Sequence, residues 1–259
     1  MTPAIADKMS PTGGEIALEG LGVRFDFDHL GRVLTPGLAR LRRKRSSAWG
    51  LKGLDLRIEA GAGVAVIGRT GSGKTTLLRV LAGVVAPDEG TASVSGAVGS
   101  LLATDAGLQG TLTGRENAEL LAVLAGLSRA QARARIEMMA AGAHLGDAFD
   151  RPVHTYSEGM RARLGFAVIQ VISPGVLVLD EVFEALDHEF RAIVEEYVLE
   201  LRGGGGVVVA AGHDHVALAR ICPRALWLDR GHAVAEGPFA EVLAAYRGSP
   251  DETSGESST

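Results

Sequence analysis

The sequence has a single cysteine, Cys222, and no stretch of about 18 or more consecutive apolar residues. One cysteine excludes an intramolecular disulfide and is typical of a reducing compartment such as the cytosol. Without a long apolar stretch we expect no transmembrane helix. Residues 1–14 also lack the apolar centre of a signal peptide. A net charge of −5 argues against a general affinity for nucleic acid.

Hydrophobic residues make up 46% of the 259 residues, which is enough for a sizeable core. Apolar runs of strand length alternate with helical patterns along the chain. This alternation predicts an α/β fold with a doubly wound, mainly parallel sheet. Residues 1–14 and 247–259 are rich in small and polar residues, so we expect two disordered tails around a folded domain of residues 15–246.

Residues 64–76 carry the most informative pattern. An apolar run, Val64–Ile67, predicts a buried strand that leads through Gly-x-x-x-x-Gly-Lys-Thr into a helix. Glycines let the backbone N–H groups point at phosphate oxygens, and the helix dipole favours the same anion. Lys74 can then reach the β- and γ-phosphates, and the Thr75 hydroxyl can bind Mg²⁺. The candidate ATP-binding residues here are Gly68, Arg69, Thr70, Gly71, Ser72, Gly73, Lys74, Thr75 and Thr76.

The alternative for this stretch is a plain glycine turn between a strand and a helix. A second pattern favours the nucleotide site. Four apolar residues precede Asp180, which places a carboxylate at the carboxyl end of a predicted central strand. There Asp180 can help Thr75 to hold Mg²⁺, and Glu181 can act as general base for an attacking water. Alone, the Asp-Glu pair would predict only a solvated strand end.

His213 follows another apolar run, Val207–Ala211. A histidine at a strand end is more often structural or exposed than catalytic. If this strand neighbours the one that carries Asp180, however, the imidazole lies near the γ-phosphate. It can then orient that phosphate, the water and Glu181.

Further elements are predicted from local patterns. Residues 15–18 and 23–25 predict a hairpin, whereas Thr113 and Ser128 each begin a capping box. The second capping box predicts a helix that runs to about Ala141. We expect a helical subdomain over about residues 104–172.

Residues 26–48 interrupt the strand-rich start of the chain. From Arg32 to Arg45 this insertion holds six cations and no acids. It is either a solvated basic loop or a basic segment that lies near a membrane surface or a membrane partner.

The stretch Tyr156-Ser157-Glu158-Gly159-Met160 resembles the signature sequence of ATP-binding cassette (ABC) ATPases. The order of phosphate loop, signature, Asp180-Glu181, Ala-Leu-Asp187 and strand-His213 is similar to that family over nearly the whole chain. The resemblance implies a P-loop NTPase with an antiparallel β subdomain and a helical subdomain. It also implies that Ser157, Glu158, Gly159 and Asp187 act in trans, on ATP bound to a second copy of the chain.

The resemblance further implies an aromatic side chain that stacks on adenine. Phe25 matches the position, and Trp49 is the alternative, with ordinary packing possible for each. One position departs from the family. The glutamine expected after the strand that ends near Leu102 is missing, because Thr104 or Asp105 lies nearest by spacing and Gln109 comes too late. The role of that glutamine is therefore assigned to no residue of this sequence.

Residues 112–117, the Tyr-Ser-x-Gly-Met signature and the basic insertion before Trp49 resemble the branch of polysaccharide exporters. Ala-Leu-Asp187 is more similar to general cassettes. We therefore expect a homodimeric, Mg²⁺-dependent ATPase subunit on the cytoplasmic face of the plasma membrane. It would drive a separate membrane permease that exports a lipid-linked polysaccharide. Its membrane association would be indirect, with possible help from residues 26–48. The alternatives are an ABC ATPase of a lipid or drug exporter, or a soluble cassette that acts on ribosomes or DNA.

Overall fold

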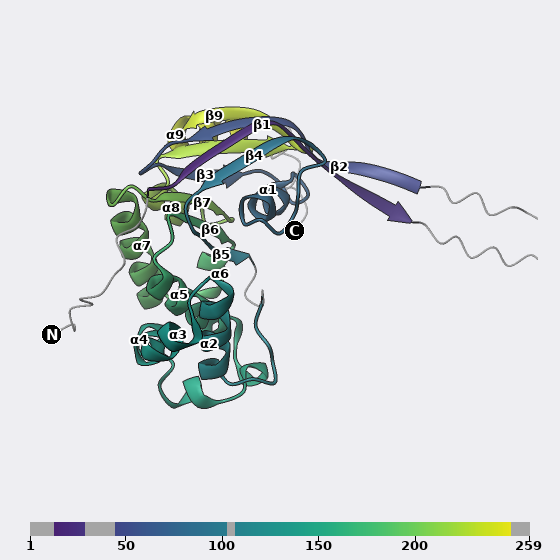
Figure 1. Ribbon diagram of the computed structural model, residues 1–259. Helices are drawn as coiled ribbons and strands as arrows, with labels where there is room; N and C mark the ends of the chain where they lie inside the picture. Colours follow the sequence, from purple (N-terminus) through teal and green to yellow (C-terminus); the bar gives the residue numbers. More distant parts are fainter. Residues whose placement is uncertain (1–12, 29–44, 103–106, 250–259) are drawn as a thin grey trace, which may run out of the picture.

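The computed structural model describes residues 13–28, 45–102 and 107–249 (Figure 1). The predicted tails therefore lie almost wholly outside the described residues, as does most of the basic insertion. Thr104 and Asp105 lie outside them too. The described chain forms a six-stranded sheet, a three-stranded antiparallel sheet and a group of helices at the far end of the molecule (Figure 1).

The six-stranded sheet has the order β5-β6-β7-β3-β8-β9. Its first five strands run parallel, and β9 pairs antiparallel with β8. The strands are β3 (Gly63–Ile67), β5 (Val98–Leu102), β6 (Val176–Asp180), β7 (Val207–Ala211), β8 (Arg224–Asp229) and β9 (His232–Pro238). Every residue of β3, β6 and β7 is buried, which explains why these strands are continuous apolar runs. The predicted mainly parallel sheet is confirmed.

Alternate residues of these strands enter two different cores. Leu177, Leu179 and Val208 face one core with the helices of the C-terminal half, whereas Val176 and Val178 face the core that includes α1 (Lys74–Leu81). The helices of the first core are α5 (Glu158–Ile172), α6 (Val182–Ala185), α7 (His188–Gly203), α8 (His215–Ile221) and α9 (Phe239–Arg247). Both faces of the sheet are thus covered.

The antiparallel sheet has the order β2-β1-β4, from β1 (Glu15–Asp28), β2 (Arg45–Ile58) and β4 (Glu89–Ser95). The hairpin predicted within residues 15–25 is wrong. These residues form one strand with register shifts between Leu18 and Arg24, and Gly20 has a φ of 58°. The irregularities look like a turn in the sequence, but both ends pair with β2. The outer ends of β1 and β2 project as a two-stranded ribbon (Figure 1).

The helical subdomain contains α2 (Gly114–Leu124), α3 (Arg129–Ala134), α4 (Ile136–Ala143) and two short 3-10 helices, η1 (Gly146–Asp150) and η2 (Val153–Thr155). Both capping boxes, at Thr113 and Ser128, are present. The single helix predicted after Ser128 is wrong, because the backbone leaves helical geometry at Arg135 and divides it into α3 and α4. These helices pack with α5 around a third core.

Candidate nucleotide site

The loop from Gly68 to Gly73 joins β3 to α1, and three of its glycines have positive φ. At Gly68 a Cβ would overlap the carbonyl oxygen of Leu228. At Gly73, where φ is 110°, a Cβ would lie 2.5 Å from the carbonyl oxygen of Gly50. These two positions need glycine both for conformation and for space.

The same loop is held by backbone contacts with two distant segments. The N–H of Gly231, in the turn between β8 and β9, donates to the Ser72 carbonyl at 2.9 Å. In turn, the N–H of Lys52 in β2 donates to the Gly231 carbonyl at 2.9 Å. The loop conformation therefore depends on both sheets.

Lys74, the first residue of α1, is buried beneath this loop, with 7% of its surface exposed. Its Nζ donates to the carbonyl oxygens of Gly68 at 2.7 Å and Arg69 at 3.2 Å. Burial lowers the pKa of Lys74, while the carboxylates of Glu181 and Asp180 act in the opposite direction. The Ser72 hydroxyl is also buried, without a hydrogen-bond partner in the described part of the chain.

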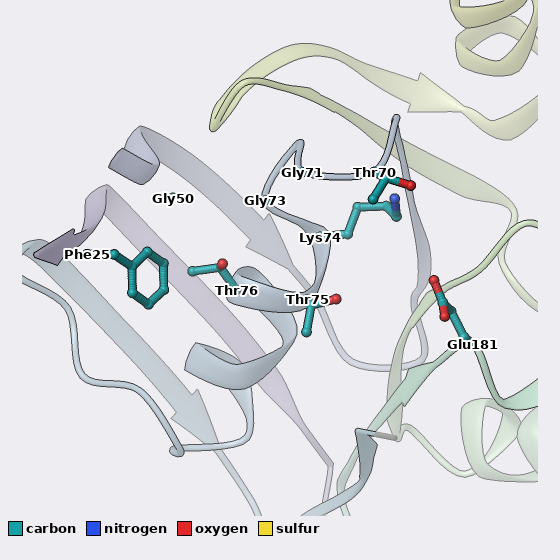
Figure 2. Close-up of a pocket in the computed structure, with 9 residues that line it drawn as sticks. All are labelled: Phe25, Gly50, Thr70, Gly71, Gly73, Lys74, Thr75, Thr76 and Glu181. Atoms are coloured by element: carbon teal, nitrogen blue, oxygen red, sulfur yellow. The ribbon is translucent and has the colours of Figure 1, made fainter. Parts of the chain in front are cut away.

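A cavity of about 280 Å³ lies beside the loop (Figure 2). Phe25 of β1 and Glu181 lie on opposite sides of the first turn of α1 in this view. The wall is formed by Phe25, Gly50, Thr70, Gly71, Gly73, Lys74, Thr75, Thr76 and Glu181. The structure thus brings most of the predicted loop residues together with Phe25, while Gly68, Arg69 and Ser72 lie outside the wall.

Gly50 also lines the cavity and is not among the residues predicted from the sequence. A Cβ at this position would lie 2.5 Å from Cε2 of Phe25. No local pattern marks this glycine, because its role comes from the register of β2 beside β1. Trp49, the alternative to Phe25, does not line the cavity. It pairs with Arg24 between β1 and β2, and the side-chain cations of Arg24 and Lys52 each lie 5.8 Å from the centroid of its ring.

Asp180 ends β6 and is 9% exposed. Burial raises the pKa of its carboxyl, whereas a hydrogen bond with the Thr75 hydroxyl lowers it. The Oδ1 atom is buried and has no hydrogen-bond partner among the described residues. A buried, unsatisfied carboxylate oxygen beside a hydroxyl suits Mg²⁺, which prefers hard oxygen ligands and keeps room for water and phosphate. The described residues include no cluster of three or more His, Cys, Asp or Glu side chains arranged to hold a metal.

Glu181 and His213 lie next to each other. The strands β6 and β7 are neighbours, and Nε2 of His213 lies 3.5 Å from Oε1 of Glu181. Both side chains are more than half exposed. Glu181 has a φ of 53°, an uncommon conformation for a residue other than glycine, and its N–H donates to the Ala211 carbonyl at 2.8 Å.

The residues predicted to act in trans gather elsewhere in the chain. Ser157 caps α5 by accepting a hydrogen bond from the N–H of Met160 at 3.3 Å. A Cβ at Gly159 would lie 2.7 Å from the Ala185 carbonyl oxygen, so the start of α5 packs against the segment before Asp187. Asp187 caps α7 and forms an ion pair with Arg163 of α5, a contact that the sequence analysis missed. None of the four, Glu158 included, lines the cavity of its own chain.

Comparison with known proteins agrees with this geometry. Residues 51–184, just over half of the chain, match the ABC transporter family. The chain belongs to the ABC transporter family. None of the helices that the structure describes combines the length and the hydropathy that a membrane crossing requires.

Relatives of this ABC protein include two O-antigen export system ATP-binding proteins. The one from Myxococcus xanthus is 36% identical over 80% of this chain and 48% of its own length. The one from Klebsiella pneumoniae is 34% identical over 76% and 80%, respectively. A teichoic acids export ATP-binding protein from Lactococcus lactis is 33% identical over 76% of this chain and 42% of its own. The chain therefore spans about half the length of the first and the third of these relatives.

Solved ABC structures share the fold. A dimeric ATP-binding cassette bound to ADP and Pi has a TM-score of 0.71 at 21% identity, covering 86% of this chain and 98% of its own. The structure of cbiO1 from Clostridium perfringens has a TM-score of 0.63 at 21% identity, covering 92% of each chain. The predicted ABC ATPase fold is confirmed.

The buried Asp180 leads to a stability prediction. Because its pKa is raised in the folded chain, the ionised form destabilises the fold. This effect appears as the pH rises above the ordinary aspartate pKa of about 3.9. Without nucleotide or Mg²⁺, Asp180→Asn should raise the melting temperature by about 2–4 °C at about pH 7.5, and less near pH 4. The exposed Asp147→Asn is the control, measured by the same calorimetric scans. A lower melting temperature for Asp180→Asn would contradict this account of the site.

Proposed function

We propose that this chain is the ATP-hydrolysing subunit of an ABC transporter that exports a lipid-linked polysaccharide through a separate membrane permease. The main support for ATP hydrolysis is that Lys74, Thr75 and Glu181 line the same cavity as the aromatic ring of Phe25. The export half is supported by the names of the relatives from Myxococcus, Klebsiella and Lactococcus.

Binding begins at the phosphate loop. Its amides, the N-terminal end of α1 and the Lys74 ammonium attract the triphosphate. Nζ of Lys74 donates to carbonyl oxygens of Gly68 and Arg69, and ATP would exchange these contacts for phosphate oxygens. Phe25 stacks on adenine from β1, at the opposite end of the cavity from Glu181.

Thr75 and Asp180 are the residues that would hold Mg²⁺. When bound, the ion neutralises charge on the β- and γ-phosphates. The unsatisfied Oδ1 of Asp180 supports this assignment, because this buried acceptor has no donor within the part of the chain that the structure describes.

Glu181 takes the proton of the attacking water as general base. His213, 3.5 Å away, donates a hydrogen bond to the γ-phosphate and keeps the water and Glu181 in line. The exposure of both side chains in the single chain fits a site that a second copy completes.

In this proposal the second copy contributes Ser157, Glu158, Gly159 and Asp187 across a shared interface. These residues do not line their own chain's cavity, and the capped start of α5 presents N–H groups and a positive dipole to an anion. The functional unit is a homodimer that ATP closes and hydrolysis opens. It sits on the cytoplasmic face of the plasma membrane through its permease and does not bind nucleic acid.

Replacement of the general base tests the ATPase half. Glu181→Gln keeps the shape of the side chain but cannot accept the proton, so kcat should fall by about a hundredfold or more. With ATP and Mg²⁺ the variant should accumulate as a dimer in light scattering after size exclusion. Glu241→Gln, exposed on α9, is the matched control. Turnover of Glu181→Gln at the parent rate would show that another group activates the water.

Two aromatic variants test the adenine contact. In the Glu181→Gln background, Phe25→Ala should weaken ATP binding about tenfold, as expected when a stacked ring is lost. Trp49→Ala should leave the dissociation constant within about twofold, because Trp49 lies outside the cavity wall. Titration calorimetry measures both. The reverse order of effects would assign the stacking role to Trp49.

A loss-of-function variant in the native cell tests the export half. Lys74→Ala should remove polysaccharide from the cell surface and lead to accumulation of its lipid-linked form inside, because export stops without ATP binding. The tagged parent chain should also co-purify with a membrane permease. Normal surface polysaccharide with altered lipid content or drug resistance would instead indicate a lipid or drug exporter. Ribosomes or DNA on the tagged chain would indicate a soluble cassette.

A further inference from the structure

Glu184, in the short helix α6, has no part in the chemistry described above. Its Oε1 accepts a hydrogen bond from the N–H of His213 at 2.7 Å and a longer one from the N–H of Asp214 at 3.4 Å. Both bonds end on the same carboxyl oxygen, and the shorter one, from His213, has the length of a strong hydrogen bond to a carboxylate. The carboxylate therefore binds the backbone of the loop that carries His213.

The Glu184 carboxylate can approach the His213 backbone only because the preceding residue, Gly212, has no side chain. A Cβ at Gly212 would lie 2.9 Å from Oε1 of Glu184 and 3.5 Å from Oε2. The carboxylate thus occupies the space next to Gly212 that a side chain would take.

A second contact connects the same two segments. Arg191 of α7 donates through Nε to the Leu186 carbonyl at 2.8 Å, and its Nη1 lies 3.2 Å from Oδ2 of Asp214. Asp214 also caps α8 by accepting from the N–H of Ala217 at 3.0 Å. Arg191 and the α8 cap thus fix the loop at Asp214, and Glu184 fixes it one residue earlier, at His213.

We infer that Glu184 is a positioning residue for His213: its carboxylate fixes the backbone of His213 so that the imidazole stays beside Glu181. The inference rests on the proposed ATPase function. It explains why the exposed side chain of Glu184 in α6 points at the backbone that follows β7, 29 residues along the chain. Glu184 touches neither nucleotide nor water in this assignment and acts only through His213.

The chemistry of the contact defines a matched series of variants. Glu184→Gln keeps an oxygen at the position of Oε1 and should retain both bonds. Glu184→Ala removes the acceptor, and Glu184→Asp keeps the charge but is one methylene shorter. We therefore expect parent behaviour from Glu184→Gln and a shared defect in the other two.

Hydrogen exchange of the full chain, read by mass spectrometry, tests the backbone contact directly. Amides of residues 212–216 should exchange about tenfold faster in Glu184→Ala and Glu184→Asp than in the parent, with exchange elsewhere unchanged. Unchanged exchange at 212–216 would overturn the inference. Global loss of protection in Glu184→Ala, with parent protection in Glu184→Asp, would also overturn it by showing a role in folding alone.

Kinetics of the same variants test whether the contact acts through His213. Glu184→Ala should lower kcat about tenfold while KM for ATP stays within about twofold, and Glu184→Gln should restore the rate. In a His213→Ala background, Glu184→Ala should cause no further loss, because the group it positions is absent.

An equal loss of kcat in both backgrounds would overturn the inference and leave the ATPase proposal standing. A parent chain without any turnover would overturn the ATPase proposal, and hydrogen exchange would still decide the role of Glu184.

Discussion

The structure depends on close backbone contact between three glycines that come from separate parts of the chain. Gly73 approaches the carbonyl oxygen of Gly50, and a Cβ at Gly231 would lie 3.0 Å from that same oxygen. A side chain at Gly73 or Gly231 would push β2 away from the loop of residues 68–73. Because the glycines allow contact, β2 and the turn between β8 and β9 support the loop through backbone hydrogen bonds. The cavity between the two sheets follows from this contact.

Two charged groups, Lys74 and Asp180, are buried at this site. Nζ of Lys74 donates to carbonyl oxygens, and Oδ1 of Asp180 has no hydrogen-bond donor among the described residues. Burial disfavours the charged form of both groups, so it lowers the pKa of Lys74 and raises the pKa of Asp180. Burial of these two charged groups thus carries an electrostatic cost. Under the proposed function, a triphosphate with Mg²⁺ would supply an anion for the first and a cation for the second, so that ATP binding would stabilise the fold.

Elements whose signal is local could be predicted from the sequence, whereas those that depend on pairing with distant segments could not. The capping boxes at Thr113 and Ser128 involve residues three apart, so the sequence contains all their partners. In contrast, β1 was predicted as a hairpin, since its bulges resemble turns until the long strand β2 is placed beside it. The helix after Ser128 was predicted without the break at Arg135, because helical periodicity continues through it. Subdomain boundaries and the roles of the site residues stay predictions.

By itself the sequence determined the phosphate loop, the fully buried strands β3, β6 and β7, and the helix caps, because each depends on residue types at short, fixed spacing. Only the tertiary structure decided that β7 lies between β6 and β3, which brings His213 to Glu181. It also decided that Phe25 rather than Trp49 lines the cavity and that Glu184 binds the His213 loop. Such contacts follow from strand order and register, which are set by the packing of whole faces and not by the pattern of any one segment.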